Sequence, residues 1–236
     1  MILNQDIRNE IENLERELQD IQFITDKNII IKELSALLIE SIKKRVKENI
    51  GIAFSGGLDS SLLALICSKL KLNFKLYSVG LQNSSDVESA SNIEIQMKWP
   101  LKLKLFNLNE ASTIISNVVN ILESTDPVRV GIACPLYSVL EIATKDKIKE
   151  VLTGLGSEEI FAGYERHRIA LNNNKVNEAC WNGLKLLWER DISRDSLIAN
   201  HFDIKLLCPF LDKELIKYAM QIDPKLKIDS ENKKII

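Results

Sequence analysis

The feature that most constrains the fold is an alternation, from residue 49 onward, of short apolar runs with longer segments of helical periodicity. Strands are predicted at residues 50–54, 74–81, 101–105 and 150–153, and helices at 58–70, 86–97, 111–122 and 133–144. Helices that separate consecutive strands imply parallel pairing through right-handed crossovers. The pattern therefore predicts an α/β fold with a doubly wound, mostly parallel sheet.

Helical segments are predicted on both sides of this alternation. Near the N-terminus, apolar residues spaced four and three apart form the seam of a short coiled coil: Ile7, Ile11, Leu14, Leu18 and Ile21. Two heptads are marginal alone, so this helix either docks on its own chain or joins two chains as a homodimer. A second helix is predicted at 29–47, and the chain beyond residue 153 reads as all-helical. We therefore expect an N-terminal helical extension at 1–28 and one domain at 29–236 with a helical C-terminal part.

The composition argues against several classes of protein. A net charge of −2 is too close to neutral for a protein that coats nucleic acid, so no nucleic-acid partner is expected. Four scattered cysteines and two histidines offer no Cys/His metal site of the usual spacing, and we expect the cysteines to be reduced. The sequence has neither a signal peptide nor an apolar run of membrane-spanning length. These features predict a cytoplasmic protein without a membrane partner.

The junction after the first predicted strand, Phe-Ser-Gly-Gly-Leu-Asp-Ser-Ser at residues 54–61, has the residue types of an anion site. Gly56 and Gly57 allow positive φ and a close approach of backbone amides to a ligand. Hydroxyl groups and the start of a helix add donors and a positive dipole end, which suit phosphate. A carboxylate, Asp59, beside phosphate is repulsive unless a cation lies between them, so it implies Mg²⁺. The alternative is a plain strand-to-helix turn in which Asp59 caps the helix.

The segment Ser-Gly-Gly-Leu-Asp-Ser at 55–60 resembles the pyrophosphate loop of the N-type ATP pyrophosphatases, the PP-loop superfamily. Members of that superfamily share an adenine nucleotide alpha-hydrolase-like fold and cleave ATP between the α- and β-phosphates. Four further stretches resemble the synthetase domain of asparagine synthetases: SSDVESA at 84–90, VLTGLGSEEIFAGYERHR at 151–168, SRDSLIANHF at 193–202 and CPFLDKELIKYA at 208–219. The resemblance is nearest to the asparagine-synthetase-domain-containing branch.

This resemblance implies a role for each residue that matches a family motif. Asp59 and Glu158 would hold Mg²⁺, although the family usually has the shorter Asp at the second position. Lys233 would stabilise charge on the departing phosphates, the alternative being an ordinary solvated lysine. Backbone groups of Val79, Leu81 and Gly154 would hold the adenine and the ribose. The β- and γ-phosphates of ATP would lie in a cradle formed by Ser55, Gly56, Gly57, Asp59, Ser60 and Ser61.

The implied enzyme is an ATP-dependent, AMP-forming ligase of the asparagine synthetase type, which belongs to amino-acid biosynthesis. A carboxylate of a small, amino-acid-like substrate would attack the α-phosphorus and release pyrophosphate. Ammonia would then convert the acyl-adenylate to an amide. Asp59, Glu158 and Lys233 are the implied catalytic residues, and most of the rate would come from alignment and charge neutralisation.

The sequence departs from the family pattern in three places. Leu155 stands where the family has the Glu of a Gly-Glu-Gly turn, and a leucine can neither take a proton nor pair with an amine. Lys205 and Leu207 replace a Glu-x-Arg pair. The chain opens with Met-Ile-Leu at 1–3 rather than with a glutaminase domain, so nitrogen is expected from free ammonia or from a separate glutaminase subunit. It stops at Ile236, where the family continues as a helix, so a trimmed chain is expected.

Two other functions are compatible with parts of the sequence. A PP-loop tRNA-modifying enzyme is disfavoured by the near-neutral charge and by the lack of paired catalytic cysteines. A non-catalytic ATP-binding or regulatory subunit is favoured by Leu155. It is disfavoured by the intact loop, because a scaffold has no need of Asp59 beside phosphates.

Overall fold

The computed structural model describes residues 6–19, 21–82, 84–229 and 231–234. The predicted start at residues 1–3 and the stop at Ile236 lie outside the described residues. The chain divides into two units, which are described separately. The sheet unit comprises residues 46–154 and 193–207, and the helical unit comprises 1–45, 155–192 and 208–236. The proposed boundary between residues 28 and 29 stays a prediction.

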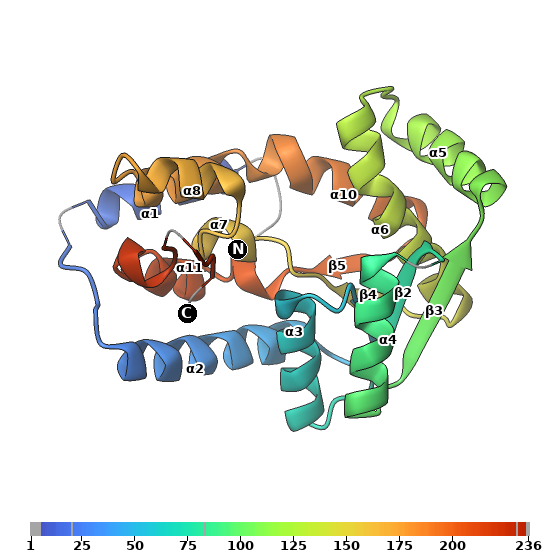
Figure 1. The fold of residues 1–236 in the computed structure, drawn as a ribbon, viewed down its shortest axis with the longest axis horizontal. Helices are drawn as coiled ribbons and strands as arrows, with labels where there is room; N and C mark the ends of the chain where they lie inside the picture. Colours follow the sequence, from blue (N-terminus) through green and yellow to red (C-terminus); the bar gives the residue numbers. More distant parts are fainter. Residues whose placement is uncertain (1–5, 20, 83, 230, 235–236) are drawn as a thin grey trace. The chain divides into compact units, whose positions relative to one another are not determined.

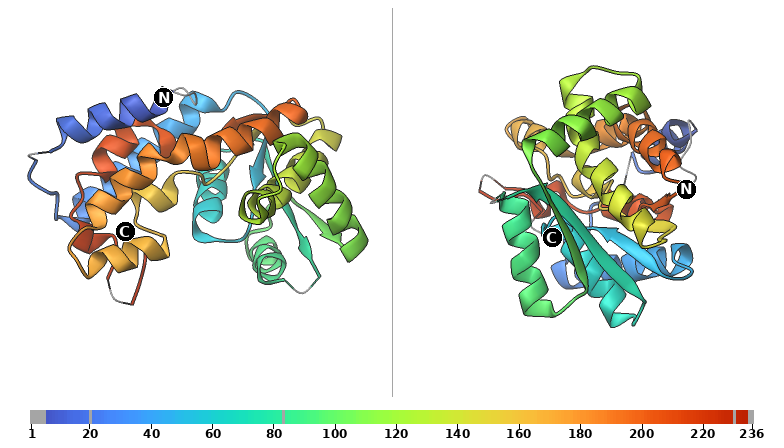
Figure 2. Two further views of the ribbon diagram at one scale, coloured as in Figure 1. Left: turned by 90° about the horizontal axis from the view of Figure 1, so that it is seen from above. Right: turned by 90° about the vertical axis from the view of Figure 1, so that its right-hand side faces the viewer.

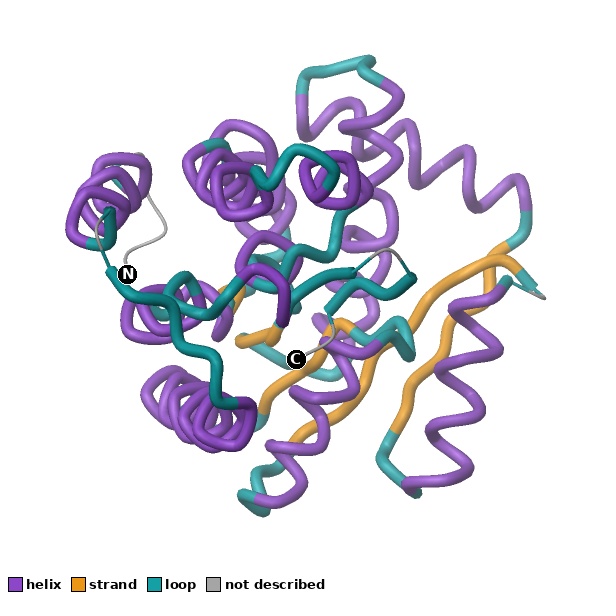
Figure 3. The backbone as a smooth tube through the Cα atoms, turned by 60° about the vertical axis from the view of Figure 1, so that its left-hand side comes forward, coloured by secondary structure: helices purple, strands orange, loops and turns teal. Residues whose placement is uncertain are grey.

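The sheet unit contains a five-stranded parallel sheet in the order β3-β2-β1-β4-β5 (Figures 1 and 3). Its strands are β1 (Ile50–Ala53), β2 (Phe74–Leu81), β3 (Leu101–Phe106), β4 (Glu150–Leu152) and β5 (Lys205–Leu207). Every pair of neighbouring strands is parallel, which confirms the predicted doubly wound sheet. The prediction of an all-helical chain beyond residue 153 is wrong at β5, because three residues are too few to show a strand period.

Helices cover both faces of this sheet. They are α3 (Leu58–Lys69), α4 (Ser85–Met97), α5 (Leu108–Leu122), α6 (Pro127–Lys145) and α10 (Ser193–His201). The right-hand view of Figure 2 shows α4 on one face and α6 on the other. α6 begins six residues earlier than predicted, because the side chain of Asp126 caps it and Pro127 suits the first helical position. The core beside α6 contains Tyr77, Val118, Leu140 and Ile198.

The edge strand β3 carries two lysines whose charges are paired with α6. Lys102 Nζ lies 2.5 Å from Asp146, and Lys104 Nζ lies 2.9 Å from Glu141. Asp146 also accepts hydrogen bonds from Lys75 and Tyr77 on β2. The hydrogen bond from Lys102, with the one from Lys75, holds the pKa of Asp146 well below its usual range. Leucine and lysine alternate along β3, which is typical of a strand with one solvated face. In this structure the ion pairs of the two lysines partly cover that face.

The helical unit contains one long helix, α2, and several shorter helical elements. They are α1 (Ile7–Glu17), α2 (Lys27–Arg45), α7 (Ser157–Ile160), α8 (Glu165–Leu171), α9 (Val176–Lys185), η1 (Trp188–Ile192), η2 (Pro209–Leu211), α11 (Lys213–Ala219) and η3 (Pro224–Leu226). α1 packs on α9, and its apolar residues Ile7, Ile11 and Leu14 are at most 1% exposed. Of the two alternatives for this helix, docking on its own chain is the one observed.

The Pro-Phe-Leu-Asp motif at 209–212 joins α2 to α11. The hydroxyl of Ser41 on α2 donates to the carbonyl of Pro209 at 2.7 Å. Arg45, at the end of the same helix, pairs with Asp212 at 3.0 Å, and Asp212 also caps α11 through the amide of Glu214. This motif therefore has a structural role within the helical unit.

One buried lysine in this unit lacks a carboxylate partner among the described residues. Lys227 is 1% exposed, and its Nζ donates to the sulfur of Met220 at 3.9 Å. Burial lowers the pKa of Lys227, because an ammonium group loses its hydration there. A charged amine in such a site destabilises the folded state.

We expect Lys227→Met to raise the free energy of unfolding at pH 7 by about 1–3 kcal/mol, the range for relieving an unpaired buried polar group. The folded-state pKa is lowered, so the wild type loses stability as the pH falls below the ordinary lysine value near 10.5. The gain should therefore be larger at pH 7 than at pH 10 in urea unfolding. Lys225→Met, at an exposed position, is the control. A gain that is absent or independent of pH would contradict this account.

Candidate active site

The loop after β1 is held against α4 by a glycine. Gly56 has φ +75°, and a Cβ at this position would lie 2.7 Å from the backbone nitrogen of Ala90 in α4. No other residue fits this combination of positive φ and close backbone approach. Gly57, by contrast, has φ −72° and precedes α3 as its N-cap, so of the two glycines that allow a positive φ only Gly56 adopts one. Its amide donates to the hydroxyl of Ser55 at 3.3 Å.

Hydroxyl groups line the opening turn of α3. Ser60 is buried, and its hydroxyl donates to the carbonyl of Gly57 at 3.2 Å. The hydroxyl oxygen of Ser61 is buried and has no hydrogen-bond partner among the described residues. The first turn of an α-helix also leaves amide groups without intrahelical acceptors. Together these donors give the start of α3 the chemistry of an anion site.

The structure brings Asp59 and Gly154 together within the sheet unit. A Cβ at Gly154 would lie 3.2 Å from the Cβ of Asp59 and 3.9 Å from its Oδ2. They meet because β1 and β4 are paired, with Gly51 opposite Val151 and Ile52 opposite Leu152. The sheet order reverses between these two strands, and ligands of parallel sheets bind at such switch points beside the carboxyl ends of the strands.

Val79 and Leu81 lie toward the carboxyl end of β2, next to β1. Val79 is half-buried, whereas Leu81 is exposed at the last position of the strand. Between them, Gly80 packs closely on α4, since a Cβ there would lie 2.7 Å from a methyl group of Val87. Their contact with adenine and ribose stays a prediction.

In the helical unit, Glu158 lies on the short helix α7. A tight turn precedes it: Gly156 has φ +97°, and a Cβ there would lie 2.3 Å from Cδ2 of Leu211. The carboxylate of Glu158 pairs with Lys234, whose Nζ lies 2.6 Å from Oε1. Glu158 and Lys234 are 34% and 12% exposed in their side chains. The resemblance assigned a role to Lys233, whereas the lysine beside Glu158 is Lys234.

Lys233 contacts different residues from Lys234. Its Nζ lies 3.8 Å from Glu165 on α8, and its side chain is 34% exposed. Its backbone forms an antiparallel bridge with Ile228. The role of Lys233 toward phosphates stays a prediction.

The neighbouring acid, Glu159, is buried within the helical unit. Its side chain is 1% exposed and pairs with Arg166 at 3.3 Å and with Arg190. Burial raises the pKa of Glu159, and the charge of Arg190 opposes that rise. Arg166 also lies 3.9 Å above the ring of Tyr164. The sequence analysis did not identify this network. Consecutive residues of a helix differ in direction by about 100°, so Glu158 and Glu159 could have been expected on different faces of α7.

The Mg²⁺ prediction rests on two acids from different units. Asp59 belongs to the sheet unit and Glu158 to the helical unit, so the structure describes each within its own surroundings. Among the described residues, no group of three or more His, Cys, Asp or Glu side chains is placed to hold a metal ion. That Asp59 and Glu158 hold Mg²⁺ stays a prediction; Mg²⁺ bound to a nucleotide takes one or two carboxylates together with phosphate oxygens and water.

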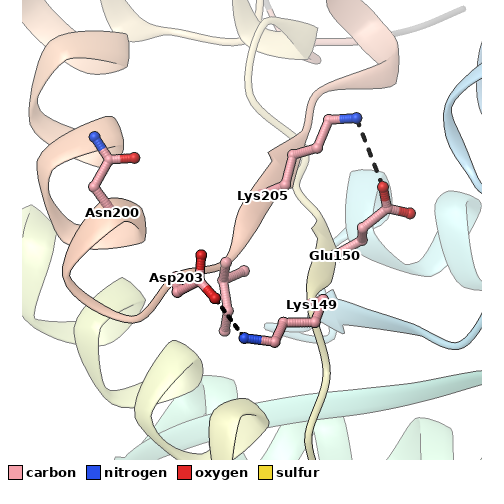
Figure 4. A pocket seen from close by; sticks show the side chains of 6 residues that line it. Lys149, Glu150, Asn200, Asp203 and Lys205 are labelled. Atoms are coloured by element: carbon pink, nitrogen blue, oxygen red, sulfur yellow. Dashed lines mark hydrogen bonds and ion pairs between the residues drawn. The ribbon is translucent and has the colours of Figure 1, made fainter.

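A hollow of about 480 Å³ lies at the starts of β4 and β5, at the amino ends of the strands and thus away from the loop after β1 (Figure 4). Lys149 pairs there with Asp203 at 2.5 Å, and Lys205 pairs with Glu150 at 3.6 Å. Both cations are thus neutralised by neighbouring acids. Lys205, which replaces a family residue, lies in this hollow at the start of β5, and Leu207 ends the same strand.

The sequence profile of the asparagine synthase family matches this chain over residues 33–197 and 170–236. A Methanocaldococcus jannaschii protein assigned to the glutamine-hydrolysing asparagine synthetases is 32% identical over 200 residues, 83% of this chain and 37% of that protein. Asparagine synthetase B of Escherichia coli, also glutamine-hydrolysing, is 27% identical over 226 residues, 89% of this chain and 40% of that enzyme. The chain thus spans about two fifths of the length of these relatives.

Two solved structures align with the chain at low scores. NH3-dependent NAD synthetase from Campylobacter jejuni aligns with a TM-score of 0.43 and 18% identity, over 76% of this chain and 94% of that one. NAD+ synthetase from Burkholderia pseudomallei aligns with a TM-score of 0.38 and 11% identity, over 93% of this chain and 90% of that one. At these scores neither structure bears on the site.

We expect Gly56→Ala to lower the free energy of unfolding by about 2 kcal/mol or more, because the new methyl group meets the backbone of α4 at a positive φ. Gly131→Ala is the matched control, since a Cβ at this position in α6 meets nothing within 4 Å. Better helix propensity should stabilise that variant by about 0.5–1 kcal/mol. Equal stability of the two variants in urea would rule out the proposed contact.

Proposed function

Because this chain belongs to the asparagine synthase family, we propose that it activates a small, amino-acid-like carboxylate with ATP and converts the acyl-adenylate to an amide. The observation that carries the proposal is the loop after β1. There Gly56 is pressed against α4, and Asp59 lies beside Gly154 at the switch point of the sheet. Backbone amides at such a loop and helix start are suited to phosphate.

The residues of this loop fit the phosphates of ATP. Ser61 has a buried hydroxyl without a partner among the described residues, and Gly56 lets the loop run directly against α4 at a positive φ. The proposed cradle consists of Ser55, Gly56, Gly57, Asp59, Ser60 and Ser61. Val79, Leu81 and Gly154 are proposed to hold the adenine and the ribose by backbone contacts.

Asp59 and Glu158 are the proposed ligands of Mg²⁺. When bound, this ion would supply positive charge that offsets the negative charge of the phosphate oxygens. Glu158 reaches one methylene further than the Asp usual in the family, which changes the geometry of the ligand and keeps its chemistry. Lys233 remains the proposed cation for the departing pyrophosphate.

The reaction has two steps. First, a carboxylate oxygen of the substrate bonds to the α-phosphorus as the bond to the bridging oxygen of pyrophosphate breaks. Loop amides and the hydroxyl of Ser61 hold the leaving phosphates and stabilise the charge that develops on them. Second, ammonia attacks the acyl carbon, AMP leaves, and the amide nitrogen loses a proton to solvent. The chain's contribution is to orient the reactants and to neutralise charge.

The source of nitrogen is part of the proposal. The relatives are named as glutamine-hydrolysing enzymes, and the part of each that this chain matches is about two fifths of its length. Ammonia is proposed to reach this site from solution or from a glutaminase on a separate subunit. A homodimer through α1 is not proposed, since the apolar face of that helix is buried within the helical unit. Among the described residues, no helix is long and apolar enough to cross a bilayer.

Leu155 favours a second candidate, an ATP-binding regulatory subunit that performs no ligation. It stands in the turn before α7, where the family has a Glu that takes part in amide formation. An aliphatic side chain cannot exchange protons with an amine. Under this candidate the chain would bind ATP and release no pyrophosphate with any amino acid.

The test is pyrophosphate release from ATP and Mg²⁺ across a panel of amino acids with ammonia. We expect turnover with at least one substrate, and Asp59→Asn should lower its rate by about 100-fold or more, because a Mg²⁺ ligand is lost. Asp203→Asn is the matched control, as this exposed acid lies at the opposite edge of the sheet. ATP binding without turnover would favour the regulatory subunit. Turnover only in the presence of tRNA would favour a tRNA-modifying enzyme.

A further inference from the structure

We propose that Lys234 is an internal counter-ion that holds the Glu158 carboxylate in place and competes with the divalent cation for it. The proposal rests on the function proposed above, because it concerns one of the acids assigned there to Mg²⁺. It assigns a positioning role to a lysine next to the one singled out by the family motif.

The first support is the geometry of the pair. Lys234 Nζ lies 2.6 Å from Oε1 of Glu158 and 3.4 Å from the hydroxyl of Ser157. The lysine side chain is 12% exposed and that of Glu158 is 34% exposed, so the pair is partly shielded from solvent. An ion pair of this kind is weakened less by salt than an exposed one.

The second support is that the carboxylate is confined on its other side. A Cβ at Gly163 would lie 1.7 Å from Oε2 of Glu158 and 2.5 Å from Cε of Lys234. The pair therefore occupies the space that any other residue at position 163 would fill. The amide of Gly163 also donates to the carbonyl of Glu158 at 2.9 Å, which fixes the turn against α7.

The third support is the backbone of the lysine itself. Lys234 has φ +54°, a left-handed conformation that residues other than glycine seldom adopt. Such a conformation persists when surrounding interactions hold it. Here the side chain that it directs is the one that meets Glu158.

A cation that uses Oε1 of Glu158 must first displace this ammonium group. The binding-competent state is then only the fraction of molecules in which the pair is open, and the apparent dissociation constant rises by the inverse of that fraction. If the pair is closed in about nine molecules of ten, removal of the lysine should tighten binding about ten-fold.

The experiment is a titration of the full chain with Mn²⁺ alone. The concentration of free Mn²⁺ is measured at each step by electron paramagnetic resonance. Lys234→Met is expected to bind Mn²⁺ about ten-fold more tightly than the wild type, whereas Lys234→Arg, which keeps the pair, should bind like the wild type. Lys225→Met is the matched control and should change nothing, because Lys225 is exposed and has no role in the proposed site. A lysine with a merely structural role would weaken binding when removed, so the sign of the change separates the two roles.

Two further variants separate this proposal from the function on which it rests. Glu158→Gln should weaken Mn²⁺ binding, and Lys234→Met should have no further effect in that background. If Glu158→Gln weakens binding while Lys234→Met leaves it unchanged or weaker, the counter-ion proposal is overturned and the proposed metal ligand stands. If neither Asp59→Asn nor Glu158→Gln affects Mn²⁺ binding, the metal site and the counter-ion proposal both fail.

Discussion

The sheet unit depends on one steric constraint, the contact of Gly56 with the backbone of α4. Because the loop after β1 runs against that helix, the chain enters α3 at a defined point and places Asp59 in its first turn. The pairing of β1 with β4 then brings the turn at Gly154 against the same acid. Three elements distant in sequence are thus arranged by two glycines without side chains, and the proposed phosphate site follows from that arrangement.

Much of this arrangement could be predicted from the sequence, because buried strands and amphipathic helices leave strong periodic signals. The strand at 50–54 and the helix after it were recognised within one residue at each end. β5 was missed because its three residues carry no period, and the start of α6 was missed because Asp126 and Pro127 act through capping rather than hydrophobicity. Motif resemblance selected Asp59 and Glu158, whereas Lys234 could not be distinguished from Lys233 by spacing alone. Only the fold shows which of two adjacent lysines meets a given carboxylate.

The two consecutive acids of α7 illustrate how one short segment serves two purposes. Glu159 is buried with Arg166 and Arg190, so it fixes the orientation of the helix within its unit. Breaking such a buried pair by removing one partner is costly, since an uncompensated charge is left inside. Glu158, one position earlier, is consequently turned toward solvent and Lys234. A buried acid and an accessible acid thus lie next to each other on a helix of a single turn.

The charged residues of β3 have a consequence for the behaviour of the whole chain in concentrated solution. β3 is the last strand on its side of the sheet, and an open strand edge invites another polypeptide to add to it. Lys102 and Lys104 are anchored to α6, so an incoming strand would have to accommodate two tethered cations and their acids along its length. The same ion pairs that tie this strand to its helix therefore also disfavour edge-to-edge aggregation.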